Sequence, residues 1–280
     1  MIIYITGASG YLGKALTVFF SEKGDTVVAL CRKNVFKHNN VVFSKYSLGD
    51  DIDKSLPKPD VCIHCAYDLS LLNFDKKKNT NVLGSKKLFD ELSKLGCSKL
   101  IYVSSFSAFE GCKSEYGKLK LLIEKEALAL NGIVIRPGLI YGGSNEGLIG
   151  KLSAVVNKNS ILPLIGTGAY TQYLTQIDDL LWCLFKITYD ELPKPEAAVV
   201  LANKNPLTFK EVLRKLSPNN IYFVPVPWLL IFRCLQAIEL ITNKLPFRSD
   251  SVLGLVFSNN NPDFSYIIEN NVNFRSLDTN

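Results

Sequence analysis

The chain has 280 residues, of which 47% are hydrophobic and 21% charged, a balance that predicts a folded globular protein and excludes a disordered one. The net charge of +6 is spread along the chain, and its longest basic run, KKK at 76–78, is interpreted as a solvated loop. No nucleic-acid-binding motif is present, so we expect no nucleic acid partner.

The first half of the chain alternates strand and helix patterns, which is typical of a parallel sheet with crossover helices. Gly24 and Gly96 each follow a predicted helix as its C-terminal cap. The predicted helices span 11–24, 79–96 and a third segment that begins after Ser114, its predicted N-cap. The predicted strands span 1–6, 26–32, 41–46, 60–66, 99–105 and 132–142.

The second half of the chain is less regular. A helix is predicted at 147–159, and the segment 162–188 combines a turn, an extended piece and a helix. The last 80 residues are expected to hold two or three further helices and short strands. The apolar segment 226–247 is interrupted by charged residues and bounded by prolines, so we expect no transmembrane segment. We interpret it as a packed helix, with a helix lying on a membrane surface as the alternative.

Cysteine usage indicates the compartment. The seven cysteines are an odd number without a disulfide-framework spacing, and the N-terminus lacks the charged region and cleavage site of a signal peptide. Both features favour a reducing compartment, and we expect a cytoplasmic protein. CIHC at 62–65 has CxxC spacing but lies inside an apolar run, which favours a buried strand. No second Cys/His pair stands at ligand spacing, so we expect no metal site.

A glycine-rich loop, TGASGYLG, joins the first predicted strand to the first predicted helix. Its G-x-x-G-x-x-G spacing lets the backbone turn tightly and approach a pyrophosphate, and the helix N-terminus that follows offers N–H groups. An ordinary glycine turn is the alternative, but a dinucleotide-binding loop requires this strand–loop–helix context. The residues expected to contact a cofactor here are Gly7, Ser9, Gly10, Tyr11, Leu12 and Gly13.

The end of the second predicted strand indicates which dinucleotide binds. A carboxylate about 20 residues past the glycines would hold a ribose 2′-OH, but Cys31 takes that place and Arg32 and Lys33 follow. A guanidinium suits a 2′-phosphate, so we favour NADP over NAD. A surface charge at a strand end is the alternative interpretation of Arg32.

Tyr116 and Lys120 are four residues apart in the third predicted helix, so their side chains point to the same face. A solvated turn of a charged helix would explain the pair, and so would a general acid whose pKa is lowered by a neighbouring cation. The apolar stripe of this helix comprises Leu119, Leu122, Ile123, Ala127 and Leu130.

These segments, in this order, resemble the extended short-chain dehydrogenases/reductases of the NAD(P)-dependent epimerase/dehydratase family. The resemblance covers roughly 1–180 and rests on TGASGYLG, DVCIHCAY, NVLGSKKLFDEL, YVSS, YGKLK, IRPGLIYG and QIDDL. It implies a Rossmann-like, doubly wound α/β fold, whose dinucleotide-binding core we place at 1–160. The remainder, 161–280, is expected to form mainly a substrate-binding lobe over the carboxyl edge of the sheet, with a segment near 171–186 returning to the core.

The resemblance implies a role for each candidate site residue. Tyr116 would be the proton donor or acceptor at the substrate oxygen, and Lys120 would lower its pKa and bind the nicotinamide ribose. Ser105 would hydrogen-bond the same oxygen, with Ser104 and Ser107 as alternatives. Further residues expected to contact the cofactor are Cys65, Ala66 and Pro137.

The implied activity is hydride transfer to or from a carbon of a nucleotide-linked sugar. A keto-sugar reductase would exchange its cofactor, whereas an epimerase would retain it. A non-catalytic NADP-binding regulator is the third interpretation. The family often forms homodimers through a four-helix interface, for which the segment 79–92 and the Tyr116 helix are the candidate faces. The pattern departs from the family at Glu115, where a proline is usual, and in the short loop between Ser105 and Tyr116.

Overall fold

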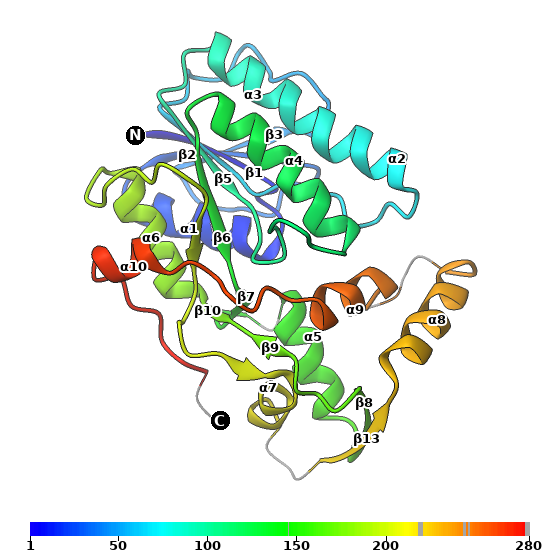
Figure 1. The fold of residues 1–280 in the computed structure, drawn as a ribbon. Helices are drawn as coiled ribbons and strands as arrows, with labels where there is room; N and C mark the ends of the chain where they lie inside the picture. The colour runs from blue at the N-terminus through cyan, green and yellow to red at the C-terminus, as the bar shows by residue number, and fades with distance from the viewer. Residues whose placement is uncertain (145, 218–220, 243–244, 246, 278–280) are drawn as a thin grey trace. The chain divides into compact units, whose positions relative to one another are not determined.

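The computed structural model describes residues 1–144, 146–217, 221–242, 245 and 247–277 (Figure 1). The chain divides into two compact units. The first comprises Met1–Ser104, Leu119–Arg136 and Leu181–Val199, and the second comprises Ser105–Lys118, Pro137–Leu180 and Val200–Asn280. The division of the chain at residue 160 stays a prediction.

A seven-stranded sheet forms the centre of the first unit, and its outermost strand runs past Val199 into the residues of the second (Figure 1). Its strands are β1 (Ile2–Thr6), β2 (Thr26–Cys31), β3 (Val41–Lys45), β4 (Val61–His64), β5 (Lys99–Val103), β6 (Ile133–Pro137) and β11 (Val199–Leu201). Their order in the sheet is β11-β6-β5-β4-β1-β2-β3, and β1 pairs in parallel with both β2 and β4. Strand order that runs outward in both directions from β1 is that of a doubly wound sheet, which confirms the expected Rossmann-like α/β fold.

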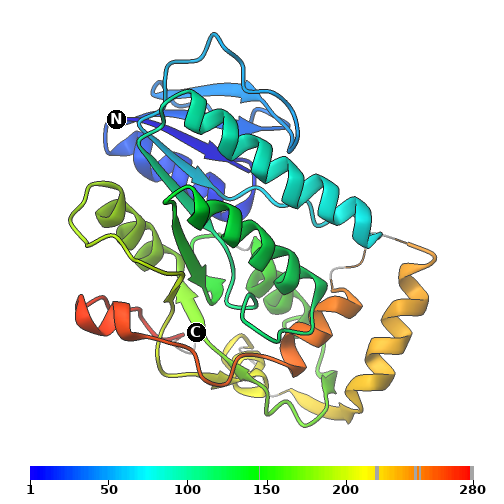
Figure 2. The same ribbon diagram turned by 45° about the horizontal axis from the view of Figure 1, so that its top comes forward.

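Helices cover both faces of this sheet. α3 (Gly84–Lys94) and α4 (Glu115–Ala129) lie side by side on one face, and α1 (Tyr11–Glu22) lies on the other (Figures 1 and 2). Lys86 of α3 and Glu126 of α4 form an ion pair at 2.7 Å. The predicted strands and crossover helices of this unit are therefore confirmed, apart from the two segments described next.

The basic run at 76–78 is helical, so its interpretation as a solvated loop is wrong. It spans α2 (Phe74–Lys77) and a π-helix, η1 (Lys78–Leu83), which lead into α3. The Asn81 side chain donates to Lys77 O at 3.0 Å, the carbonyl that would accept the Asn81 N–H in an α-helix, and the wider π-turn leaves room for this bond. The predicted helix at 79–96 thus begins as η1 and continues as α3.

The predicted strand at 132–142 is two strands, because the chain leaves the sheet at Gly138. β6 ends at Pro137, and β7 (Leu139–Tyr141) pairs in parallel with β10 (Leu174–Gln176) in the second unit. A Cβ on Gly138 would lie 2.3 Å from Tyr173 O, so only glycine fits at this point.

The predicted start of α4 is confirmed, and so is part of its apolar stripe. Ser114 caps the helix, since its Oγ accepts the backbone N–H three residues later at 3.1 Å. Leu119, Ile123 and Ala127 are fully buried along one side of the helix. Leu130 lies beyond the last residue of α4 and is 42% exposed, so it is not part of the stripe.

The second unit is built from shorter elements. Its further strands are β8 (Ile161–Ile165), β9 (Thr171–Gln172), β12 (Leu207–Thr208) and β13 (Tyr222–Val226). Its complete helices are α5 (Gly147–Val156), α7 (Phe209–Lys215), α8 (Trp228–Glu239), α9 (Ser249–Val256) and α10 (Ser265–Glu269), and α6 (Ile177–Thr188) continues into the first unit. The sequence predicted two or three helices in the last 80 residues, and the described part of that segment holds four.

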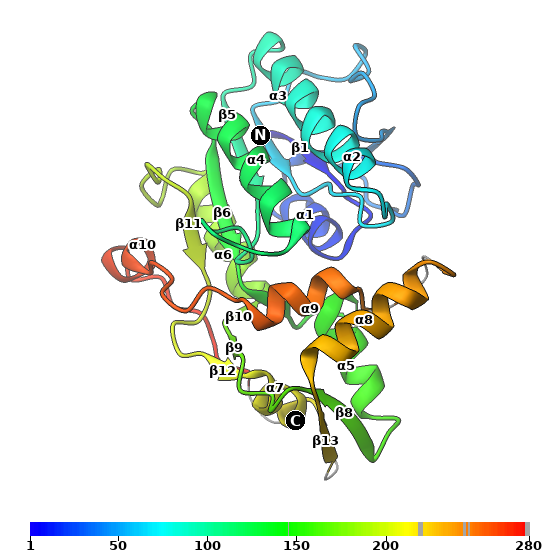
Figure 3. The ribbon, with the colours of Figure 1, turned by 45° about the vertical axis from the view of Figure 1, so that its right-hand side comes forward.

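The segment 226–247 contains α8, although its residues 243, 244 and 246 lie outside the described residues. The rings of Trp228 and Phe257 meet edge to face at 5.7 Å and pack α8 on α9 (Figure 3). No described residue of α8 is fully buried, so the helix is packed on one side only. Across the described ranges, every helix is too short or too polar to cross a membrane.

Candidate active site

The glycine loop between β1 and α1 is folded so tightly that side chains are excluded. Gly7 has a φ of +66°, and a Cβ there would lie 2.8 Å from Ala66 Cα. A Cβ on Gly13 would lie 2.3 Å from Gly7 O, the carbonyl to which Gly10 N donates at 2.8 Å. The start of α1 and the chain after β4 therefore approach the loop closely, as binding of a pyrophosphate requires.

The N-terminus of α1 suits an anion. Within the described residues its N-cap, Gly10, makes no side-chain capping bond, and the first turn carries no acidic residue. The N–H groups and the positive dipole end of such a terminus favour a phosphate. The backbone from Gly7 to Gly13 thus fits a dinucleotide, with Ser9, Tyr11 and Leu12 inside the segment that would hold it.

A buried histidine organises the chain just after β4. Thr6 Oγ1 lies 2.6 Å from His64 Nδ1, and Ser85 Oγ lies 2.8 Å from His64 Nε2. Because Ser85 donates to Asn81 O at 2.6 Å, its oxygen accepts from Nε2–H, and Thr6 donates to Nδ1. Thr6 Oγ1 in turn accepts the Ala66 N–H at 3.2 Å. Burial lowers the pKa of His64 to about 3, so a neutral imidazole holds the backbone that faces Gly7.

The end of β2 presents a cation beside the glycine loop. The Cys31 thiol is buried and donates to Lys33 O at 3.2 Å, and burial raises its pKa. The next side chain, Arg32, is 71% exposed, and its Nη1 lies 3.7 Å from Asp68 Oδ2. Arg32 is therefore accessible to a ligand, and Asp68 is the anion with which a phosphate would compete.

Tyr116 lies in the first turn of α4, and the Ser105 side chain is close enough to act on the pKa of its hydroxyl. Burial of the phenol raises the pKa of Tyr116 to about 12, while the Ser105 hydroxyl opposes this shift. The net shift of the Tyr116 pKa is upward, whereas the family resemblance implied that Lys120 lowers this pKa. Ser107 is held by Ser105 itself, whose Oγ accepts the Ser107 N–H at 3.2 Å.

Lys120 follows one turn further along α4, and only 3% of its surface is exposed. Its Nζ donates to Val103 O at 2.9 Å and lies 4.9 Å from the centre of the Tyr102 ring. Burial lowers the pKa of Lys120 to about 8, and the neighbouring Cys65 and Glu124 oppose this shift. A solvated helix turn is thus the wrong interpretation of Lys120, and a buried amine with such a pKa is typical of functional sites.

One carboxylate near Lys120 was not identified from the sequence. Glu124 is 3% exposed and binds Arg136 through two bonds of 2.9 and 2.6 Å. Ser104 Oγ donates to the same carboxylate at 2.5 Å. The i+4 spacing from Lys120 is the signal that could have found Glu124. Since Ser104 is bound to Glu124, Ser105 is the better candidate for the reacting oxygen.

The other predicted residues lie at strand ends. Cys65 and Ala66 directly follow β4, and Pro137 is the last residue of β6. CIHC is the buried strand expected, with Cys62 and His64 fully buried in β4. All seven cysteines are free thiols, and no group of His, Cys, Asp and Glu in the described ranges is arranged to hold a metal ion.

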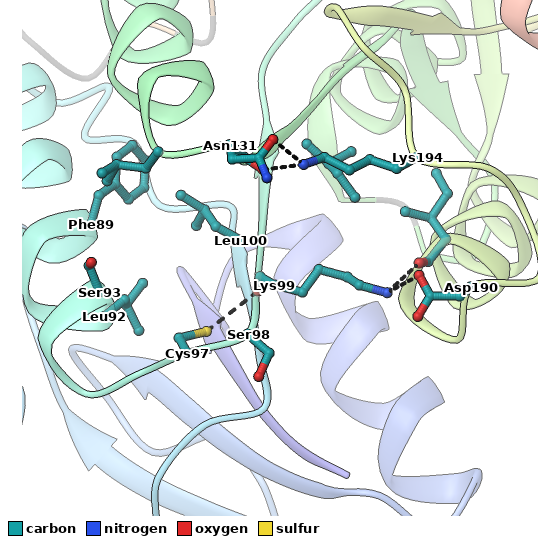
Figure 4. Close-up of a pocket in the computed structure, with 13 residues that line it drawn as sticks. Phe89, Leu92, Ser93, Cys97, Ser98, Lys99, Leu100, Asn131, Asp190 and Lys194 are labelled. Atoms are coloured by element: carbon teal, nitrogen blue, oxygen red, sulfur yellow. Dashed lines mark hydrogen bonds and ion pairs between the residues drawn. The ribbon is translucent and has the colours of Figure 1, made fainter.

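A separate pocket of about 190 Å³ lies in the first unit and is lined by none of the predicted site residues (Figure 4). Its charged groups are already paired. Lys99 binds Asp190 at 2.7 Å, and Lys194 donates to Asn131 O at 2.6 Å. These bonds join the ends of α4 and α6 to neighbouring segments, so we assign the pocket a structural role.

The doubly wound sheet, the glycine loop and the tyrosine–lysine pair define a dinucleotide-binding α/β protein. The chain belongs to the NAD dependent epimerase/dehydratase family, since a sequence model of that family matches residues 3–197. The resemblance inferred from the motifs is therefore confirmed.

Relatives in this family have different activities. The chain is 28% identical over 200 residues to an uncharacterised protein of Sinorhizobium fredii. This match spans 63% of the chain and only 50% of the length of that relative. It is 24% identical over 247 residues to UDP-glucose 4-epimerase of Vibrio cholerae and 23% identical over 254 residues to 2-alkyl-3-oxoalkanoate reductase of Stenotrophomonas maltophilia. Each of these two matches spans 77% of the chain and 74% of the relative.

Solved structures share the fold. An epimerase from Methanothermobacter thermautotrophicus matches with a TM-score of 0.69 and 20% identity over 80% of each chain. UDP-glucuronic acid 4-epimerase from Bacillus cereus, in complex with UDP-glucuronic acid and NAD, matches with a TM-score of 0.69 and 18% identity over 81% of this chain and 86% of that one. At this identity the likeness shows the fold alone.

Proposed function

We propose that the protein transfers a hydride between NADP(H) and a carbinol or ketone carbon of a nucleotide-linked sugar, and that it acts as a keto-sugar reductase. The observation that carries the proposal is the grouping of Tyr116 at the start of α4 with Ser105, which acts on the pKa of the phenol, and with the buried Lys120 one turn further along the helix. A phenol, a hydroxyl and an amine with a shifted pKa are suitable groups for moving a proton at a substrate oxygen.

Tyr116 would donate the proton that the substrate oxygen takes up. In the reductive direction the carbonyl carbon receives the hydride and the oxygen takes the Tyr116 Oη proton, so a ketone becomes an alcohol and Tyr116 becomes a phenolate. The Ser105 hydroxyl would stabilise that phenolate by hydrogen bonding, and the Lys120 ammonium would stabilise it by charge. Because burial raises the pKa of Tyr116 to about 12, the phenol is protonated beforehand, which supports the reductive direction.

A bound dinucleotide would supply or accept the hydride. The backbone from Gly7 to Gly13 would hold its pyrophosphate, and Cys65, Ala66 and Pro137 would line its site. We propose NADP because the exposed Arg32 guanidinium suits a 2′-phosphate. NAD is the alternative, since the Bacillus cereus structure is a complex with NAD.

An epimerase that retains its dinucleotide is the second candidate, because the Vibrio cholerae relative is a UDP-glucose 4-epimerase. The Stenotrophomonas maltophilia relative is a reductase, which supports net reduction of a carbonyl group. A non-catalytic NADP-binding regulator is disfavoured, because a regulator has no use for the buried Lys120 or for a serine that acts on the pKa of Tyr116.

The test separates the two enzymes by the fate of the cofactor. The protein is purified without added dinucleotide and denatured, and the supernatant is assayed for NADP and NAD. The native protein is then supplied with NADPH and a series of UDP- and dTDP-linked keto-sugars. A reductase is empty as purified and consumes NADPH with one of these substrates. Stoichiometric bound dinucleotide without net NADPH consumption would instead identify an epimerase.

A further inference from the structure

The backbone N–H groups at the start of α4 are bound by a residue from the C-terminal part of the chain. Glu115 N donates to Asp250 Oδ1 at 2.7 Å, and Tyr116 N donates to Asp250 Oδ2 at 3.0 Å. Gly117 N donates to Ser114 Oγ at 3.1 Å. Ser114 is the local cap, whereas Asp250 lies 134 residues beyond Tyr116 in the first turn of α9. One carboxylate therefore binds two successive peptide groups, one of which belongs to Tyr116.

We propose that Asp250 is a positioning residue for Tyr116, holding the first turn of α4 so that the phenol stays aligned with Ser105. The inference rests on the proposed function, because it gives Asp250 a role only if Tyr116 is the proton donor. The first N–H groups of a helix have no partner within the helix, and a turn without caps frays. An anion is also favoured by the dipole at this end of the helix.

A second carboxylate holds the helix that carries Asp250. Glu239, the last residue of α8, accepts the Ser249 N–H through Oε1 at 2.7 Å and the Ser249 hydroxyl through Oε2 at 2.8 Å. Ser249 is the first residue of α9. The start of α9 is thus bound by a carboxylate of α8, through one backbone N–H and one hydroxyl, much as the start of α4 is bound by a carboxylate of α9. Glu239 consequently supports the orientation of Asp250.

α9 packs against the segment that follows Ser105 and against the residue that caps the Tyr116 helix. A Cβ built on Gly254, one turn after Asp250, would lie 3.9 Å from Ser107 Oγ and 3.9 Å from Ser114 Cβ. Ser107 is in turn bound to Ser105. The segment Ser105–Lys118 also belongs to the same compact unit as Val200–Asn280. The serine and the tyrosine of the candidate site are therefore organised by the C-terminal part of the chain.

The test compares Asp250→Ala and Asp250→Asn with a matched control, Asp263→Ala. Asp263 Oδ1 accepts the Ser265 N–H at 2.8 Å at the start of α10, so its removal also uncaps a helix of the second unit, but not the one that carries Tyr116. Each variant is examined for the hydrogen exchange rate of the Tyr116 amide, for NADPH affinity and for turnover with the substrate found above. Asp250→Asn, which keeps one acceptor oxygen, guards against a failure of Asp250→Ala to fold.

We expect the Tyr116 amide to exchange faster in both Asp250 variants, most of all in Asp250→Ala. We also expect turnover to fall roughly 10- to 100-fold, as misplacement of a catalytic group by about 1 Å would cause. NADPH affinity should stay at the wild-type value, and Asp263→Ala should leave exchange and turnover unchanged. Unchanged exchange at Tyr116 in Asp250→Asn and Asp250→Ala would overturn the capping role.

The two proposals fail in distinguishable ways. Wild-type turnover in Asp250→Ala, with impaired turnover in Tyr116→Phe, would overturn the positioning role and leave the proposed function standing. Wild-type turnover in Tyr116→Phe would remove the proton-donor role, and the positioning role would be lost with it. An equal fall in turnover in Asp263→Ala would show a general loss of stability in the second unit, and would also overturn the positioning role.

Discussion

Ser104 and Ser105 are neighbours in the chain, yet they act on different side chains. Ser104 Oγ lies 2.5 Å from Glu124 Oε1, whereas the Ser105 hydroxyl acts on the pKa of Tyr116. Successive side chains of extended backbone point to opposite sides, so two adjacent serines reach different partners. One serine thus completes the pair of Arg136 with the buried Glu124, and the other is the serine that we propose acts at a substrate oxygen.

The two serines should therefore give opposite results when each is changed to alanine. Ser105→Ala should lower turnover by roughly 10²-fold with little effect on stability, since it removes the hydroxyl that acts on the proposed proton donor. Ser104→Ala should lower the free energy of unfolding by about 1–3 kcal/mol, because the buried Glu124 loses a hydrogen bond. Turnover and urea denaturation of both variants check this, and the reverse pattern would assign Ser104 to the reaction.

Cofactor preference should depend on Arg32. A charge-assisted bond to the 2′-phosphate is worth about 1.5–3 kcal/mol, so Arg32→Ala should weaken NADPH binding by roughly 10- to 150-fold and leave NADH binding unchanged. Arg233→Ala, in the exposed part of α8, is the control and should change neither. Fluorescence titration of wild type and variants with both dinucleotides gives the affinities. Equal affinity of the wild type for NADPH and NADH would refute the preference for NADP.

The local pattern of the sequence was enough for most of the fold, because the β1 to β5 runs and the α1 and α4 stripes are set by residues a few positions apart. The missed features depend on distant contacts. Gly138 breaks a predicted strand because of the Tyr173 carbonyl, and Asp250 caps α4 from 134 residues away. The pKa of Tyr116 depends on burial, which spacing alone does not reveal.

An alanine should destabilise the glycine loop more at position 13 than at position 10. A Cβ at position 13 would lie 2.3 Å from Gly7 O, whereas a Cβ at position 10 would lie 3.2 Å from the same atom. Gly13→Ala should therefore lower the free energy of unfolding without cofactor by about 1–3 kcal/mol, as overpacking does, and Gly10→Ala by less. Thermal denaturation of the two variants, with NADPH titration beside it, measures this. A Gly13→Ala variant as stable as Gly10→Ala would contradict the described loop.

Stability should fall on mild acidification because of His64. An unfolded histidine titrates near 6.5, whereas burial lowers the pKa of His64 to about 3 in the folded protein, so the unfolded state binds more protons between these values. The contribution of neutral His64 is complete above about pH 6.5 and is lost by up to ~1.4 kcal/mol for each pH unit below it.

The chain has two histidines, and the second one, His38, is exposed. His38 therefore serves as the control for His64. His64→Gln should be less stable than wild type at pH 7.5, but its stability should change less between pH 6.5 and 5. His38→Gln should follow the wild-type curve. Urea denaturation at a series of pH values tests both, and a His64→Gln curve parallel to wild type would rule out His64 as the titrating group.

The central claim is that Tyr116 is the proton donor in a hydride transfer, and it is tested most directly by the single-turnover rate of NADPH oxidation in Tyr116→Phe. The variant keeps the ring that packs at the start of α4 and loses only the hydroxyl on which Ser105 acts. The account predicts an NADPH affinity equal to that of wild type and a rate lower by roughly 10²–10⁴, the usual worth of a positioned general acid. A Tyr116→Phe enzyme that oxidises NADPH at the wild-type rate would contradict it.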